Sequence, residues 1–336
     1  STAAGTTYYR VVISNAGNGC GSVTSNPATV IINNDITITT QPADNTECIG
    51  GTTQLSVVAT GGVGTLTYQW ESSTVLAGPY TAIVGATASS YTPPSTAAGT
   101  TYYRVVISNA GNGCGSITSN PATVIINNDI SITTQPADIT ECIGGTTQLS
   151  VVATGGVGTL TYQWESATVL AGPYTAIVGA AASSYTPPST AAGTTYYRVV
   201  ISNAGNGCGS VTSNAATVII NNDISITTQP ADITECIGGT TQLSVVATGG
   251  VGTLTYQWES ATVLAGPYTA IVGATASSYT PPSTAAGTTY YRVVISNTGN
   301  GCGSVTSNAA TVIINNDISI TTQPADITEC IGGTTQ

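Results

Sequence analysis

Cysteine is the residue type with the clearest chemistry in this chain. Eight cysteines recur along 336 residues in two evenly spaced sets: Cys20, Cys114, Cys208 and Cys302, and then Cys48, Cys142, Cys236 and Cys330. Regular, even cysteine usage in a chain rich in Thr, Gly and Asn indicates disulfides and an oxidising, extracellular setting. A zinc site is not expected, because the sequence has no His and no Cys-x-x-Cys pair.

The other reactive side chains do not form a recognisable catalytic set. Hydrolytic triads need a base, and the sequence has no His; Schiff-base chemistry needs Lys, and there is none. The acids are Asp35, Asp44, Glu47 and Glu71 with their copies, and no apolar cleft is implied around them. We therefore expect neither an enzyme nor a cofactor.

Few residues carry charge, and most of the charge is negative. Charged residues make up 6% of the chain, the net charge is -11, and the only cations are Arg10, Arg104, Arg198 and Arg292. Nucleic-acid binding needs clustered Lys and Arg, so it is excluded, and attraction to anionic lipid surfaces fails for the same reason. The Val and Ile runs are far shorter than the ~18 apolar residues of a membrane span.

The sequence repeats almost letter for letter every 94 residues, since STAAGTTYYR starts at Ser1, Ser95, Ser189 and Ser283. A period of this length is the size of one small β-domain. The expected organisation is a set of repeats at 36–129, 130–223 and 224–317, preceded by the last strands of another repeat at 1–35 and followed by the first strand region of another at 318–336. Strings of like domains usually set length and spacing.

Within one period, apolar residues alternate in short runs with the period of a strand rather than a helix. In the unit 36–129 we expect strands at 36–41, 53–60, 65–71, 89–94, 100–108 and 118–126, with one or two edge strands in 73–85 and a hairpin loop at 109–115. Nothing indicates a helix. Seven or eight short strands per unit predict an all-β fold of tandem antiparallel β-sandwiches.

The position of one tryptophan makes the fold more specific. YQW at 68–70, followed by GTTYYRV at 99–105, resembles the immunoglobulin pattern of a core Trp and a tyrosine corner. The whole period, including LSVVATGG, IVGATASSYTPP and TTYYRVVISNAGNGCGSVTSN, resembles the Ig-like repeats of very large surface proteins of Bacteroidota and related bacterial adhesins. The resemblance implies tandem Ig-like domains of about seven strands, and such repeats serve stalks and adhesins alike.

One departure from antibody domains predicts the core. Val57 and Val105 replace the two cysteines that would bridge the sheets, as do Val151/Val199 and Val245/Val293. We expect the tryptophans to pack over these valines and the second tyrosine of each TYYR to be the corner residue, giving the core set Trp70, Trp164, Trp258, Tyr103, Tyr197 and Tyr291.

Alternation also places the few charges. If Trp70 and Val105 face inward, Glu71 and Arg104 face outward on neighbouring strands and can form an ion pair across the sheet. The same pairing is expected for Glu165 with Arg198 and for Glu259 with Arg292. An exposed pair of this kind contributes only ~0–1 kcal/mol.

The disulfide pairing follows from the Ig topology. Cys48 and Cys114 would lie at opposite ends of one sandwich, whereas in a head-to-tail array the bottom of one domain meets the top of the next. We therefore expect interdomain disulfides, Cys48 with Cys208 and Cys142 with Cys302. Two alternatives stay open: an intradomain Cys48–Cys114 bridge, and the sequence-nearest scheme that pairs Cys20 with Cys48 and repeats along the chain.

The junctions between repeats are short, as in VIINNDITI at 30–38, and lack a Gly/Ser-rich or Pro-rich spacer. Short linkers predict restricted interdomain motion. Asn33, Asn34 and Asp35 form a weak match to an interdomain calcium site, but one Asp per junction, joined at most by Asp44 or Glu47, is too few carboxylates. We expect a solvated turn and no metal.

The function that fits best is a structural repeat segment of an extracellular or cell-surface fibre or adhesin stalk. Its partners would be neighbouring repeats of the same chain or identical chains in a filament, with no nucleic acid and no membrane insertion. The alternative is a multivalent glycan- or surface-binding module, for which Tyr80, Tyr174 and Tyr268 are the candidate contacts. We expect these tyrosines to cover the edge of the core instead.

Overall fold

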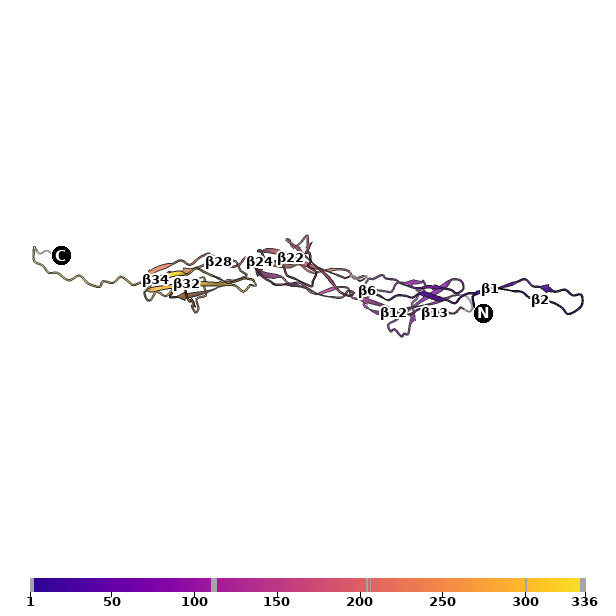
Figure 1. Ribbon diagram of the computed structural model, residues 1–336. Coiled ribbons are helices and arrows are strands. Elements are labelled where there is room, and N and C mark those ends of the chain that lie inside the picture. The colour runs from indigo at the N-terminus through magenta and orange to yellow at the C-terminus, as the bar shows by residue number, and fades with distance from the viewer. Residues whose placement is uncertain (1–2, 110–113, 204, 206, 300, 333–336) are drawn as a thin grey trace.

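The computed structural model describes residues 3–109, 114–203, 205, 207–299 and 301–332. Residues 110–113 of the predicted hairpin loop 109–115 lie outside the described residues. The described part of the chain contains strands and turns and no helix. Three sandwiches follow one another along an extended array, with the N-terminal hairpin at one end and residues 318–332 at the other (Figure 1).

The larger sheet of the first repeat carries most of its contacts. Its strand order is β10-β9-β12-β14-β6, and β13 also pairs with β12. All pairs are antiparallel except β6 with β14, which run parallel. The bounds are β6 Asn45–Cys48, β9 Leu66–Ser73, β10 Thr81–Ala82, β12 Gly99–Asn109, β13 Ile117–Thr118 and β14 Ala122–Asn127.

The second layer consists of two short antiparallel pairs, β5 with β8 and β11 with β7. These strands are β5 Thr37–Thr40, β7 Leu55–Ser56, β8 Val58–Thr60 and β11 Ser90–Tyr91. The side chains of this layer that face the larger sheet, Leu55 and Val57, are buried. The all-β, tandem Ig-like sandwich predicted from the sequence is confirmed.

The other two repeats have the same order of strands. In the second repeat they are β15 Ser131–Thr134, β16 Ile139–Cys142, β17 Leu149–Ser150, β18 Val152–Thr154, β19 Thr161–Ala167, β20 Thr175–Ala176, β21 Ser184–Tyr185, β22 Gly193–Ser202, β23 Val211–Thr212 and β24 Ala216–Asn221. In the third they are β25 Ser225–Thr228, β26 Ile233–Cys236, β27 Leu243–Ser244, β28 Val246–Thr248, β29 Thr255–Ala261, β30 Thr269–Ala270, β31 Ser278–Tyr279, β32 Gly287–Ser296, β33 Val305–Thr306 and β34 Ala310–Asn315.

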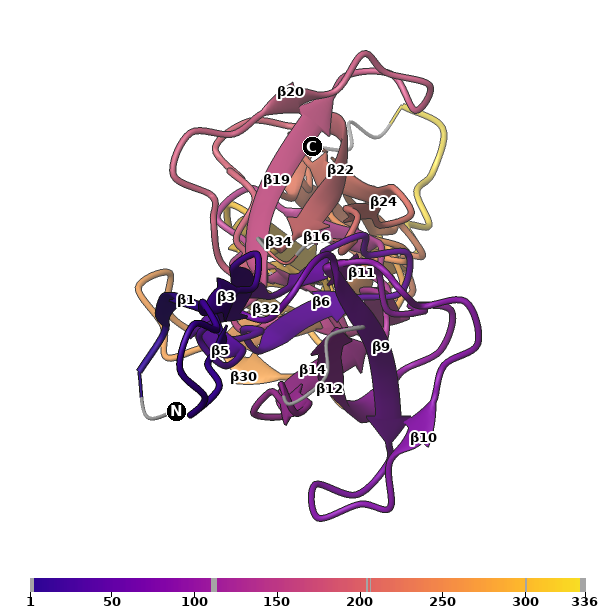
Figure 2. The same ribbon diagram turned by 90° about the vertical axis from the view of Figure 1, so that its right-hand side faces the viewer.

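Successive repeats are turned about the long axis of the array. Seen along that axis, β9 and β10 of the first repeat point to one side, and β19 and β20 of the second point to the opposite side (Figure 2). Equivalent side chains of neighbouring repeats therefore lie on different faces of the fibre.

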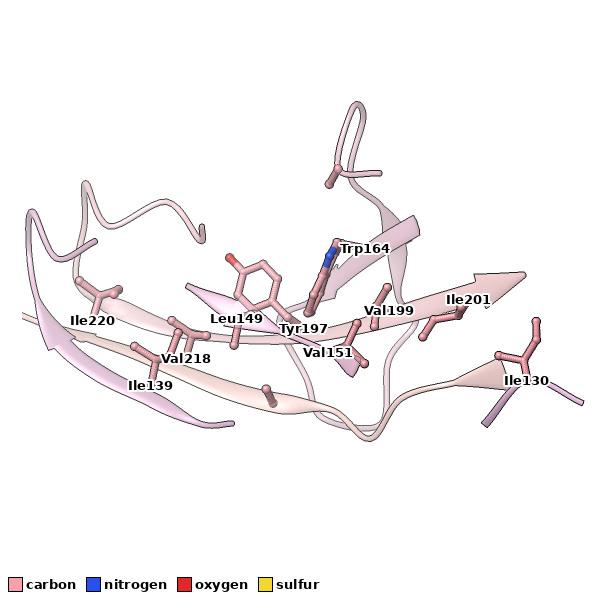
Figure 3. Packing of buried hydrophobic residues seen from close by; sticks show 12 residues of the cluster. Ile130, Ile139, Leu149, Val151, Trp164, Tyr197, Val199, Ile201, Val218 and Ile220 are labelled. Atoms are coloured by element: carbon pink, nitrogen blue, oxygen red, sulfur yellow. The ribbon is translucent and has the colours of Figure 1, made fainter. Parts of the chain in front are cut away.

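The core of each repeat is a single layer of apolar side chains between the two sheets. Trp164 is fully buried and lies in one cluster with Val151 and Val199 (Figure 3). Trp70 and Trp258 are buried in the same way among the equivalent valines. The Trp70 indole N–H donates to the Ala88 carbonyl at 3.0 Å, so the polar atom of the largest core residue is satisfied.

The predicted first strand at 36–41 differs from what the structure contains. β5 ends at Thr40, and the chain then passes Pro42 and forms a second strand, β6, which the sequence did not reveal. The Asp44 carboxylate accepts a hydrogen bond from Thr123 N at 2.7 Å, and this contact aligns β6 with the start of β14. β6 matters because it ends at Cys48.

The two terminal segments behave differently from each other. Residues 5–32 form a hairpin in which β1 (Gly5–Tyr9) pairs with β4 (Ala28–Ile32) and β2 (Val12–Ile13) pairs with β3 (Val23–Thr24). The register of these pairs is the same as that of β12 with β14 and of β12 with β13 in the first repeat. Residues 318–332, expected to begin another repeat, are exposed and contain no strand in the part that the structure describes.

Candidate functional site

The reactive side chains of the chain come together at the joints between successive repeats. Each joint has two halves. One is the corner that follows the parallel edge strand, residues 47–51, 141–145 and 235–239 in the three repeats. The other is the tip loop of the next repeat, which joins β22 to β23 (residues 203–209) or β32 to β33 (residues 297–303). Residues 204, 206 and 300 of these loops lie outside the described residues.

A disulfide crosses each of the two joints. Cys48 is bonded to Cys208 and Cys142 to Cys302, with Cα–Cα distances of 4.9 Å and a sequence separation of 160 in both cases. Cys48 is the last residue of β6 and lies at the end of the first repeat that faces the second. Cys208 lies in the loop between β22 and β23, at the end of the second repeat that faces the first. These are the interdomain pairs that the head-to-tail argument placed first.

Glycine makes the close approach between the two halves possible. Gly207 has a φ of +76°, which favours glycine, and a Cβ built there would lie 2.5 Å from Gly51 N and 2.9 Å from Cys48 O. At the second joint a Cβ on Gly301 would lie 2.6 Å from Gly145 N. The backbones of neighbouring repeats are therefore in direct contact, and no side chain fits between them.

The linker between the first two repeats, Asn127 and Asn128, is hydrogen-bonded to both of them. Asn127 O accepts a hydrogen bond from Ile49 N of the first repeat at 3.1 Å, and Asn128 O accepts one from Gly156 N of the second at 2.8 Å. The equivalent contacts at the next joint, from Ile143 N to Asn221 O and from Gly250 N to Asn222 O, have the same lengths. Adjacent linker residues are thus bonded to different repeats, which leaves little freedom for a hinge.

The tip loop is braced by one asparagine side chain. Asn203 Oδ1 accepts hydrogen bonds from Val157 N at 3.0 Å and from Gly205 N at 2.8 Å, and Asn203 Nδ2 donates to Val157 O. In the third repeat, Gly299 N donates to Asn297 Oδ1 at 2.7 Å. These contacts fix the loop on its own repeat and so position the disulfide-bonded cysteine.

The corner is equally well supported. Gly50 N donates to Ser95 O at 2.9 Å, and the Ser95 hydroxyl donates to Gly51 O at 2.6 Å. The Glu47 carboxylate is fully buried and accepts a hydrogen bond from Thr53 N at 3.2 Å. A Cβ on Gly51 would lie 2.2 Å from the Glu47 carboxyl carbon, so the glycine makes room for this acid.

Comparison with protein families identifies the repeat. A model described as "Domain of unknown function (DUF8696)" matches residues 37–128, 132–222 and 226–316. The chain belongs to this family. The matched ranges begin and end within a few residues of the repeat boundaries expected from the sequence.

Solved structures similar to the three DUF8696 repeats include tandem immunoglobulin domains. The three N-terminal domains of the bacteriophage RB49 Highly Immunogenic Outer Capsid protein match with 13% identity and a TM-score of 0.47, over 84% of this chain and 99% of that one. Titin domains I67–I69 match with 12% identity and a TM-score of 0.44, over 83% and 98%. Sidekick-1 immunoglobulin domains 1–5 match with 18% identity and a TM-score of 0.43, over 94% and 67%. No curated protein matches the chain.

The predicted outward-facing charges of the DUF8696 repeats lie opposite each other. Arg104 is paired in register with Glu71, and Arg104 Nε lies 2.7 Å from Glu71 Oε2. Arg198 with Glu165 and Arg292 with Glu259 have the same distance. Each arginine is about one-third exposed, so solvent screens the pair.

Tyr80 covers this ion pair rather than the edge of the core. The Arg104 guanidinium lies 4.1 Å from the centre of the Tyr80 ring, and the Tyr80 hydroxyl donates to Leu76 O at 2.8 Å. Tyr174 and Tyr268 make the same contacts. The sequence did not indicate this contact, because it depends on how the loop before β10 folds back over the sheet.

The corner tyrosines are buried against a second tyrosine in each DUF8696 repeat. Tyr103 is 4% exposed, and its ring centre lies 5.7 Å from that of Tyr91, which in turn stacks on Trp70. Burial raises the pKa of Tyr103 above its ordinary value, and Tyr91 raises it further, while a hydrogen bond with Thr101 acts in the opposite direction. These tyrosines form part of the core.

Neither a metal cluster nor a membrane helix occurs in the described part of the DUF8696 chain. Within those residues, no group of three or more His, Cys, Asp or Glu could hold an ion. The same residues include no helix long and apolar enough to cross a membrane. Asp44, one of the acids considered for calcium, is instead bonded to Thr123 N.

Proposed function

We propose that this chain is a structural segment of an extracellular fibre or adhesin stalk, of the kind that Ig-like repeats form in large bacterial surface proteins. The number of repeats sets its length, and the joints set its stiffness. The observation that carries the proposal is the triple restraint at each joint: a disulfide, a glycine contact between backbones, and linker carbonyls bonded to both repeats.

The extracellular location and the absence of catalysis are supported by different features. Disulfides persist in oxidising compartments. The sequence has no His or Lys to act as a base or a nucleophile. The glycan-binding alternative depended on Tyr80 and its copies, whose hydroxyls and rings are already engaged within the repeat. We therefore favour the structural fibre over the glycan-binding module.

The disulfides also change the route by which tension would travel. From the N-terminus, the shortest covalent path to Cys236 runs to Cys48, crosses the disulfide to Cys208, and continues through β24 and β25 to Cys236. This path bypasses residues 49–207, which include the tryptophan-containing cores of the first two repeats. A pulled fibre would load this path alone, so residues 49–207 could not be drawn out into extended chain while the disulfide is intact.

Single-molecule stretching tests this function. Force is applied between the N-terminus and a handle on the Cys236 thiol, in a chain carrying Cys20→Ser, Cys114→Ser and Cys330→Ser so that no other free cysteine reacts. At ~3.5 Å per extended residue, the oxidised chain should stop lengthening at about 260 Å and the reduced chain at about 820 Å. Adding Cys48→Ser and Cys208→Ser to the oxidised chain should raise the limit to about 730 Å, because the shortest covalent path then runs to Cys142, crosses to Cys302 and returns to Cys236. An oxidised chain that extends to the longer limit would rule out a disulfide-stapled stalk.

A further inference from the structure

The loops closed by the two disulfides overlap in the second repeat. One bond closes the chain from Cys48 to Cys208 and the other from Cys142 to Cys302, so residues 143–207 lie inside both loops. The overlap exists because the 160 residues between bonded cysteines exceed the repeat period of 94. Every main-chain bond between Cys48 and Cys302 therefore lies inside at least one closed loop, and those between Cys142 and Cys208 lie inside two.

Each half of the second repeat is consequently tied to both neighbouring repeats. The half before the Val178–Gly179 turn continues from the first repeat through the linker and is joined to the third by the Cys142–Cys302 bond. The half after that turn is joined to the first repeat by the Cys48–Cys208 bond and continues through the linker into the third. Two covalent connections thus run from the first repeat to the third, and neither depends on the other.

The two connections follow adjacent strands of the same sheet. β16, which ends at Cys142, belongs to the first half, and β24, which leads to the next linker, belongs to the second. The two strands are parallel, and Cys142 lies opposite Asn221 where both end. The Asp138 carboxylate accepts a hydrogen bond from Thr217 N at 2.7 Å and aligns the pair at its start. Tension along the array is therefore shared by two neighbouring strands.

The exposed turns of the repeat lie outside both connections. Among its described residues, the three most exposed large apolar side chains are Val178 at 100%, Val169 at 59% and Leu170 at 58%. All three flank β20, between Cys142 and Cys208 in the sequence. Exposed loop tips are the preferred sites of proteolytic nicking. A protease that cuts at these turns would sever neither β16 nor β24.

The two halves of the repeat also form one core. β19 of the first half pairs with β22 of the second, β17 pairs with β21, and β16 pairs with β24. Trp164 of the first half lies in one cluster with Tyr197 and Val199 of the second (Figure 3). Because these contacts join the halves through side chains and strand pairing, they do not require an intact main chain at Val178.

We propose that the overlapping disulfides make this chain tolerant of main-chain cleavage. An extracellular endoprotease cuts an exposed turn of the second repeat, and the nicked repeat stays folded and continues to connect its neighbours. The proposal rests on the proposed stalk function and names a class of enzyme that such a stalk withstands. Disulfides within single repeats would secure each cut by one bond, whereas the overlap secures a cut in the second repeat by two.

The test introduces one cleavable turn into the full chain. An insert of about ten residues, Gly and Ser around a single Arg, is placed between Val178 and Gly179, where a loop tip tolerates insertion. Trypsin then has an accessible site there, while Arg104, Arg198 and Arg292 lie inside β12, β22 and β32. The remaining accessible residues are replaced in all chains: Arg10 by Gln, and the free cysteines Cys20, Cys114, Cys236 and Cys330 by Ser.

Denaturing electrophoresis without reductant reads the covalent connections. The two tryptic fragments should stay linked and should separate on reduction. They should also stay linked when one bond is removed, by Cys48→Ser with Cys208→Ser or by Cys142→Ser with Cys302→Ser, and separate only when both bonds are removed. Separation in either single-bond variant would overturn the proposal.

The same insert between Val84 and Gly85 is the matched control. This turn lies inside the Cys48–Cys208 loop alone, so Cys48→Ser with Cys208→Ser should release the fragments there. Fragments that stay linked in this control would also overturn the proposal, because a bond other than the two described would be holding them.

Continued digestion shows whether the nicked repeat remains folded. Cleavage after Arg198 should be at least about tenfold slower than cleavage at the insert, because a paired strand must open before a protease can cut it. Equal rates with linked fragments would overturn the cleavage tolerance and leave the stalk function standing. Fragments that separate while all four joint cysteines are present would remove the stalk function as well.

Discussion

The corners of the three repeats share a sequence but differ in their surroundings. In the first two, Glu47 and Glu141 are 0% and 1% exposed, and the adjacent cysteines are fully buried. In the third, Glu235 is half-buried and Cys236 is exposed. The tryptophans, by contrast, are fully buried in all three repeats.

This difference separates two kinds of stability. The core of a repeat is complete without a neighbour, because Trp258 is as buried in the uncovered repeat as Trp70 is in the first. Burial at the corner is created only when the next repeat docks. Each repeat is therefore a folding unit, and the joint is a separate structure built on top of it.

The largest expected difference in the free energy of unfolding is between removing a cysteine of the first joint, Cys208, and removing the cysteine of the uncovered corner, Cys236. The first-joint disulfide closes a long loop, so Cys208→Ser should lower the free energy of unfolding by ~5 kcal/mol in the chain-entropy model. Cys236→Ser should change it by less than ~0.5 kcal/mol, since surface substitutions have small effects. Guanidinium unfolding followed by tryptophan fluorescence gives both values.

A reducing agent provides the control for that comparison. Under reduction the Cys208→Ser chain and the parent chain should become equally stable, because the bond that distinguishes them is gone. A Cys236→Ser chain as unstable as Cys208→Ser would mean that the third corner is also covered in solution.

The second contrast isolates the contact between backbones. Gly207 and Gly158 have φ values of +76° and +73°, but a Cβ on Gly158 would meet nothing within 4 Å. Replacing either by Ala should cost about 1–2 kcal/mol for the left-handed backbone. Gly207→Ala should cost a further ~1–3 kcal/mol from overpacking against Gly51 and Cys48.

Urea unfolding of the two alanine variants measures this difference. Both substitutions lie in the second repeat and have the same backbone cost. The difference between their losses in free energy of unfolding therefore measures the contact at the joint. Equal losses in the two variants would show that the tip loop can withdraw from the corner without a penalty, and that the disulfide alone holds the repeats together.

Features that depend on a strict local period were predictable from the sequence. Alternation along 65–71 and 100–108 placed Trp70 inward and Glu71 outward, because successive side chains of a strand face opposite sides. The faces of the two longest strands, and hence the ion pair, followed without further information. The position of Cys48 relative to Cys208 followed from the order of domains in a head-to-tail array.

Features that depend on a distant partner were not predictable in the same way. The NTEC segment of β6 has no alternating pattern, and it becomes a strand because it pairs with β14, far along the chain. The brace from Asn203 to Val157 and the contact of Gly207 with Gly51 involve loops whose conformation the sequence does not encode locally. Glycine at 207 was visible in the NGCG motif, but its role appears only once two repeats meet.

Removing the ion pair between the Arg and Glu side chains should have the smallest effect on the free energy of unfolding. This effect should be the same in the second repeat, whose corner is covered, and in the third, whose corner is not. The Arg198–Glu165 and Arg292–Glu259 pairs lie on sheet faces away from the corners and have the same geometry. Arg198→Met removes an exposed ion pair and a cation–π contact with Tyr174 but retains an aliphatic side chain, so the loss should be about 1 kcal/mol or less.

Arg292→Met in the third repeat is the matched variant, and double-mutant cycles with Glu165→Gln and Glu259→Gln measure the coupling between each pair of side chains. The two coupling energies should agree within a few tenths of a kcal/mol, which is the usual error of such cycles. A clearly larger coupling in the second repeat would mean that docking tightens the whole sheet, and the separation between a self-sufficient core and an added joint would then be wrong.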